Sequence, residues 1–134
     1  MAQTGINAGE RDMSVEFLDH ININTKKLDE CITFYGEIIG LETGYRPDIP
    51  IPGAWMYCEG RPVVHIMEMD GGREGPTGPI DHVAFKCTGL ADFKKRIEDA
   101  GLTWDVNTIA EMGVTQLYVD DPDGVKVELN FEEV

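Results

Sequence analysis

The chain has 134 residues, which suits one domain or two small halves that share a core. Its 25 acidic residues outnumber its 11 basic residues, and the formal net charge is −14. This charge argues against nucleic acid and anionic membrane surfaces as partners, because binding to either needs clustered Lys and Arg. No apolar run approaches the roughly 20 residues that cross a bilayer, and the polar start MAQTGINAGERDMS is unlike a secretory signal. We therefore expect a cytoplasmic protein.

The composition along the chain predicts one folded unit behind a polar tail. Residues 1–14 are expected to be a disordered tail, and residues 15–134 a single domain. Inside this domain, the Gly/Pro-rich segment DGGREGPTGP at residues 70–79 is expected to link two modules, residues 15–69 and 80–134.

The two modules begin alike. FLDHINI in the first and PIDHVAF in the second each carry an Asp-His pair within an apolar run, at His20 and His82. In both modules, apolar residues then recur at three- and four-residue spacing, over residues 28–39 and 90–100, and a glycine follows. This pattern predicts a strand followed by a helix in each module.

Three short strands are expected after each helix. In the first module they are residues 42–46, AWMYCEG and PVVHIMEM, and in the second they are residues 103–107, TQLYVDD and GVKVELNF. The turn formers EGRP and DPDG separate the last two strands of each module. The prediction is therefore an α+β fold of two βαβββ modules. Their curved mixed sheets should lie side by side, with helices on the outer faces and a cleft between the sheets.

Four side chains with metal-binding chemistry are expected to face this cleft. Strand residues alternate between two faces, so His20, His65, His82 and Glu128 point away from the apolar residues beside them, and each histidine should lie inside a strand. Imidazole nitrogens and carboxylate oxygens are donors that a divalent transition metal accepts. The pattern predicts one divalent metal ion per site, with Fe, Mn, Ni, Co and Zn as candidates.

These features resemble the vicinal oxygen chelate superfamily, which includes glyoxalases, extradiol dioxygenases and the bleomycin- and fosfomycin-resistance proteins. The resemblance covers about residues 15–132. It implies paired βαβββ modules whose metal ligands come from the first and last strand of each, which by position are His20, His65, His82 and Glu128. It also implies a small-molecule substrate and a homodimer, since small members are usually dimers and exposed sheet edges need covering.

The leading hypothesis is a metal-dependent enzyme of glyoxalase type. It would carry out proton transfer, isomerisation or lyase chemistry on a substrate that chelates the metal through vicinal oxygens. Glu128 is expected to act as the base as well as a ligand. Tyr118, which shares a strand face with Gln116, is expected to donate a proton or orient the substrate, unless it only packs in the cleft wall.

A ring-cleaving extradiol dioxygenase is the first alternative. The run LYVDDPDGVKVE resembles the end of the extradiol signature, although the histidine expected near Glu111 is absent. If His65 is not a ligand, then His20, His82 and Glu128 form a 2-His-1-carboxylate triad with room for a catecholate and O₂. His65 would then be free to act as the acid/base.

The chain can also be compared with the lactoylglutathione lyases and the bleomycin-resistance proteins of the superfamily. Lactoylglutathione lyases usually have glutamate where His65 stands, and Arg46 and Arg61 are the nearest candidates for the basic residues that hold glutathione. A non-catalytic binding protein like the bleomycin-resistance proteins is the second alternative. The complete ligand set argues against it.

Overall fold

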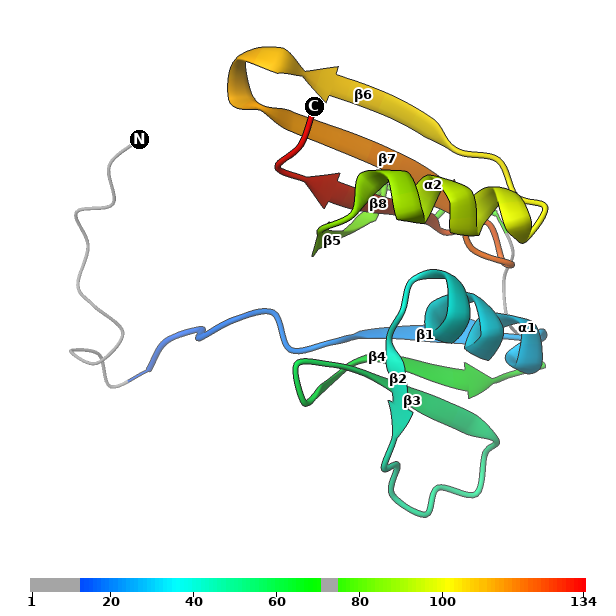
Figure 1. Cartoon of the computed structure of the whole chain (residues 1–134). Helices are drawn as coiled ribbons and strands as arrows, with labels where there is room; N and C mark the ends of the chain where they lie inside the picture. Colours follow the sequence, from blue (N-terminus) through cyan, green and yellow to red (C-terminus); the bar gives the residue numbers. More distant parts are fainter. Residues whose placement is uncertain (1–12, 71–74) are drawn as a thin grey trace.

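The computed structural model describes residues 13–70 and 75–134, so most of the expected tail and part of the expected linker lie outside the described residues. The described chain forms two modules, each with its own four-stranded sheet, one above the other in Figure 1. Within the part of the chain that is described, no helix is long and apolar enough to cross a membrane.

Both modules follow the predicted βαβββ order. Module 1 consists of β1 (Ile21–Thr25), α1 (Leu28–Thr33), the π-helix η2 (Phe34–Ile38), β2 (Glu42–Gly44), β3 (Gly53–Cys58) and β4 (Arg61–Glu68). Module 2 consists of β5 (Val83–Cys87), α2 (Leu90–Asp99), β6 (Asp105–Ile109), the short 3₁₀-helix η3 (Ala110–Met112), β7 (Val114–Asp120) and β8 (Lys126–Phe131). The sheet orders are β1-β4-β3-β2 and β5-β8-β7-β6. The first strand of each module runs parallel to the last, and the other pairs are antiparallel. The α+β prediction is confirmed.

Alternating burial gives each sheet one packed face and one open face. In β4, Val64 and Ile66 are fully buried while His65 between them is partly exposed. In β7, Leu117 is buried and Tyr118 is partly exposed. The packed faces of both sheets belong to one hydrophobic core.

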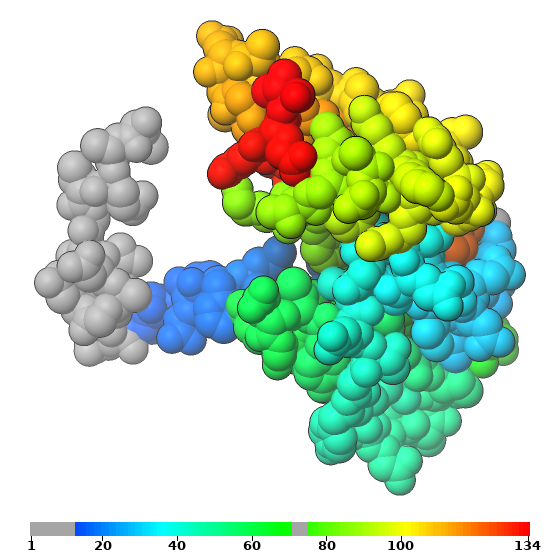
Figure 2. Space-filling model, viewed as in Figure 1, coloured from blue at the N-terminus to red at the C-terminus, as the bar shows by residue number. Residues whose placement is uncertain are grey.

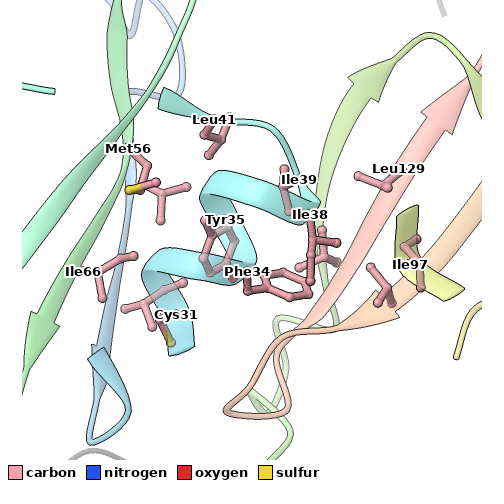
Figure 3. Close-up of a cluster of buried hydrophobic side chains, with 14 of the residues drawn as sticks. Cys31, Phe34, Tyr35, Ile38, Ile39, Leu41, Met56, Ile66, Ile97 and Leu129 are labelled. Atoms are coloured by element: carbon pink, nitrogen blue, oxygen red, sulfur yellow. The ribbon is translucent and has the colours of Figure 1, made fainter. Parts of the chain in front are cut away.

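The helices lie between the two sheets, not on the outer faces as predicted. Figure 3 shows Tyr35 facing the Met56 side of the core, whereas Phe34 and Ile38 point towards Ile97 in module 2. The helical segment is therefore apolar on two sides, and burying both sides requires a sheet on each. As a consequence, the open faces of the two sheets turn away from one another within one chain.

A buried polar cluster also joins the modules. The Tyr35 hydroxyl donates to Asp121 Oδ2 over 2.8 Å, and the Cys31 thiol donates to Asp123 Oδ2 over 3.1 Å. Asp121 Oδ1 accepts the backbone N–H groups of Asp123 and Val125 at 2.8 and 2.9 Å. Burial raises the pKa of the Asp121 carboxyl, and it raises the pKa of the Cys31 thiol to about 12. The DPDG turn of module 2 is thus anchored to the helix of module 1.

The first strands begin one residue later than the position of each histidine. β1 starts at Ile21 and β5 at Val83, so the prediction that His20 and His82 lie inside strands was wrong. In module 1 the parallel partner of β1 is β4, which contains Pro62. Because proline has no N–H group, the hydrogen-bond ladder between the two strands cannot be extended past this residue. Before β1, the chain projects from the body of the molecule (Figure 2), and Leu18 is 83% exposed there.

Candidate metal centre

The open face of sheet 1 carries a stack of three rings. The His20 and His65 ring centroids are 3.8 Å apart, and the Trp55 and His65 centroids are 4.0 Å apart, with nearly parallel planes. Trp55 stands opposite His65 in the β3–β4 register, which positions the stack. Module 1 therefore brings its two predicted ligands, His20 and His65, together.

Hydrogen bonds select the free nitrogen of His65. Its Nε2 lies 3.0 Å from the carbonyl oxygen of Pro62. A carbonyl only accepts hydrogen bonds, so Nε2 carries the proton and Nδ1 keeps its lone pair. Burial lowers the pKa of His65, and the neighbouring His20 and the charge of Arg46 lower it further. The ring is thereby held in the neutral form that a metal requires.

The aspartate of each Asp-His pair contacts the imidazole ring of its histidine. His20 Nδ1 lies 2.6 Å from Asp19 Oδ2, and His82 Nδ1 lies 2.9 Å from Asp81 Oδ2. The hydrogen bond from each imidazole lowers the pKa of its aspartate, so both carboxylates remain ionised acceptors. Each Nδ1 must then donate a hydrogen bond to its aspartate. The other ring nitrogen, Nε2, keeps the lone pair that can bind a metal ion. Metal-binding histidines are oriented in this way by a carboxylate on the far ring nitrogen.

Sheet 2 brings His82 and Glu128 together. His82 Nε2 lies 3.2 Å from Glu128 Oε1, and the Glu128 side chain is almost fully buried. Because His82 Nδ1 donates to Asp81, Nε2 and Oε1 both present lone pairs unless a second proton or a metal ion lies between them. Two donors bound at about 2.1 Å and at a right angle stand about 3 Å apart, so this separation suits one metal ion.

The four predicted ligands are thus brought together as two pairs. His20 and His65 lie on the open face of module 1, and His82 and Glu128 lie on that of module 2. Across residues 13–70 and 75–134, no three His, Cys, Asp or Glu side chains are grouped so as to hold a metal ion. The complete four-ligand site remains a prediction.

Polar side chains continue the site across sheet 2. The Tyr118 hydroxyl donates to Gln116 Oε1 over 3.3 Å, and Asn107 Nδ2 donates to the same oxygen over 2.8 Å. Asn130 Nδ2 donates to Glu128 Oε2 over 3.2 Å. Burial and the Glu128 charge raise the pKa of Tyr118, so its phenol keeps its proton.

Several of these supporting contacts are not predicted from the sequence. In the sequence Asp19 and Asp81 mark the repeat, but an acid directly before a candidate ligand histidine is also a signal for a partner that orients the ring. The contact of Asn107 with Gln116 depends on the register of β6 against β7. That register has no signature in the sequence.

Comparison with known proteins places these modules in a family. Residues 17–129 match the family described as the Glyoxalase/Bleomycin resistance protein/Dioxygenase superfamily. The chain is 28% identical over 121 residues to "Glyoxylase I 4" of Arabidopsis thaliana, a match that covers 84% of this chain and 68% of the relative.

Solved structures show the same fold. The fosfomycin resistance protein FosX from Listeria monocytogenes has a TM-score of 0.71 at 21% identity, covering 90% of this chain and 100% of its own. A glyoxylase/bleomycin resistance protein/dioxygenase domain from Frankia has a TM-score of 0.71 at 21% identity, covering 88% of this chain and 98% of its own. With the family match over most of its length, this chain belongs to the glyoxalase/bleomycin resistance protein/dioxygenase superfamily.

Proposed function

We propose that this chain is a metal-dependent enzyme of glyoxalase type, acting on a small substrate with two adjacent oxygens. The observation that carries the proposal is the His82–Glu128 contact, in which an imidazole nitrogen and a carboxylate oxygen lie 3.2 Å apart. A divalent ion between them would satisfy both atoms. Asp19 contacts His20 as Asp81 contacts His82, and this supports a metal-binding role for His20 in module 1 as well.

We infer that the four ligands meet between two copies of the chain. β1 and β5 are edge strands, and each begins directly after a predicted ligand, His20 or His82. Leu18 and Ile80, which stand two residues ahead of these histidines, are 83% and 69% exposed. A two-fold partner would cover both free edges and bring the open face of one module 1 against the open face of the other chain's module 2.

The chemistry follows from the polar groups on these faces. When bound, a divalent ion supplies Lewis acidity at two adjacent substrate oxygens. The Glu128 carboxylate, whose Oε2 accepts a hydrogen bond from Asn130, would accept the proton lost by the neighbouring carbon. The protonated Tyr118 hydroxyl would return a proton or orient the substrate.

The relatives support this reading. The Arabidopsis relative carries the name glyoxylase I. A variant of the Listeria protein was solved with Mn(II) and 1S,2S-dihydroxypropylphosphonic acid, a ligand with adjacent hydroxyls. Its TM-score against this chain is 0.71.

Ring-cleaving dioxygenase chemistry is the second candidate, because of one observation at His65. The Pro62 carbonyl occupies its Nε2, so ligation would have to use Nδ1. If His65 does not ligate, the remaining triad leaves room for a catecholate and O₂, and His65 becomes the acid/base.

His65→Ala separates the two candidates. For the glyoxalase type, the Mn(II)-loaded wild type should exchange the carbon-bound protons of hydroxyacetone for deuterium without consuming O₂. His65→Ala should then bind Mn(II) about tenfold or more weakly, because one donor is lost. Isothermal titration measures the Mn(II) affinity, NMR in D₂O measures the deuterium exchange, and an oxygen electrode measures the O₂ consumption.

The opposite pattern would contradict the proposal. Oxygen uptake with catechol, together with a His65→Ala variant that keeps its Mn(II) and loses only turnover, would assign the chain to the dioxygenases. Trp55→Leu is the matched control, since it removes a ring from the stack but no metal donor.

A further inference from the structure

Arg46 is partly buried, and its guanidinium group lacks a full set of hydrogen-bond partners. It lies in the loop between β2 and β3, and its Nη2 donates to the Ile51 carbonyl over 2.8 Å. Its Nε is buried and has no hydrogen-bond partner. Within the described ranges, no carboxylate forms an ion pair with Arg46, although Lys86, Lys95 and Lys126 are all paired with acids. An unpaired buried donor of this kind is costly and calls for an explanation.

The guanidinium lies beside the candidate metal centre. A Cβ added at Gly53 would stand 2.8 Å from Arg46 Nη2 and 3.0 Å from its Cζ, so the group covers this glycine. Gly53 is two residues before Trp55 on β3, and strand alternation therefore puts both on the open face of sheet 1. Trp55 stacks on His65. Arg46 thus borders the same surface as the two histidines of module 1.

The loop holds Arg46 in place. Residues 45–52 contain three prolines, which fix the backbone and remove N–H donors. The Tyr57 hydroxyl also donates to the Tyr45 carbonyl over 2.6 Å. The guanidinium is therefore presented by a constrained segment, and little freedom is lost when a ligand binds to it.

We propose that Arg46 recognises an oxyanion on the substrate, a carboxylate or a phosphate group, while the adjacent oxygens of the same molecule occupy the metal centre. The substrate class would then be a vicinally oxygenated acid with a second, anionic end. A chain with a net charge of −14 repels such a molecule elsewhere, so a guanidinium without a carboxylate partner provides both attraction and orientation. The inference rests on the proposed function for the placement of the metal-binding end.

Three α-hydroxy acids with the same chelating end test this assignment. Glycerate has a neutral end, malate ends in a carboxylate, and glycerate phosphorylated on its terminal hydroxyl ends in a phosphate. Dissociation constants are measured by titration calorimetry in Mn(II) and, separately, in EDTA. The wild type should bind at least one of the two charged-end acids about tenfold or more tightly than glycerate, and Arg46→Met should remove this preference.

Arg46→Lys should restore part of the preference, and Lys94→Met is the control, because it removes a cation from module 2 that rests on the Trp104 ring at 4.7 Å. A thermal melt of each variant reports folding. Equal affinities for the three acids in the wild type, or a preference that Arg46→Met keeps, would overturn the inference. A preference that depends on Arg46 but not on Mn(II) would support it and count against the metal proposal instead.

Discussion

Glu128→Ala is expected to weaken the binding of divalent metal by about a hundredfold or more. The Glu128 carboxylate is the only anionic donor in the proposed set, and its Oε1 already lies at metal-bridging distance from His82 Nε2. Without it, the ion would be left with imidazole donors alone and with no negative charge to offset its own. Calorimetric titration of the metal-free wild type and of metal-free Glu128→Ala with Mn(II) gives the two affinities.

Glu132→Ala is the matched control for this measurement. Glu132 directly follows β8, the strand that contains Glu128, but it is exposed and paired with Lys86. It should leave the Mn(II) affinity unchanged. Equal Mn(II) binding by wild type and Glu128→Ala would refute the assignment of Glu128 as a ligand.

Asp121→Ala is expected to lower the free energy of unfolding by about 3 kcal/mol, because three donors, two of them buried, lose their acceptor. These donors are the Tyr35 hydroxyl and the backbone N–H groups of Asp123 and Val125. Urea denaturation measures the change. Asp120→Ala, which alters the exposed neighbour, should cost far less, and equal effects at the two positions would argue against the buried link between the modules.

The same carboxyl gives a pH dependence with a defined sign. Burial raises the pKa of Asp121 in the folded protein above its value in the unfolded chain. The contribution of Asp121 to stability is therefore complete below the unfolded pKa and is lost as the pH rises through the raised folded pKa. Asp121→Asn does not titrate, so its stability relative to the wild type should increase as the pH rises through this window. A difference that stays constant with pH would contradict this linkage.

Much of the fold was predictable from local patterns. The spacing of apolar residues from Leu28 to Ile39 predicts the helical segment, and the alternation in PVVHIMEM and GVKVELNF predicts β4 and β8. The relation of the two modules was not predictable in the same way. A pattern identifies an apolar surface but not the surface that covers it, and Phe34 and Ile38 on the second side of the helix bury against module 2.

The candidate site divides along similar lines. Alternation assigns His65 and Glu128 to the open faces. In the structure His65 is partly exposed, whereas Glu128 is almost fully buried beside His82. Alternation does not say which open faces meet, because that depends on how the shared core orients the sheets. The unpaired state of Arg46 was also beyond prediction, since it depends on the path of loop 45–52 over Gly53.

Complementation between two inactive variants tests most directly whether the metal site is shared between two chains. His20→Ala/His65→Ala removes the ligands of module 1, and His82→Ala/Glu128→Ala removes those of module 2. In a homodimer of either variant both sites are broken. A mixed dimer, however, combines the intact module 1 of one chain with the intact module 2 of the other.

After the two variants are mixed and allowed to exchange subunits, Mn(II) binding should reappear at about a quarter of the wild-type capacity, because half of the dimers are mixed and each has one intact site. Sedimentation confirms the dimers, and differently sized tags report the exchange. Mixed dimers that bind no Mn(II), or a protein that sediments only as a monomer, would contradict the shared site.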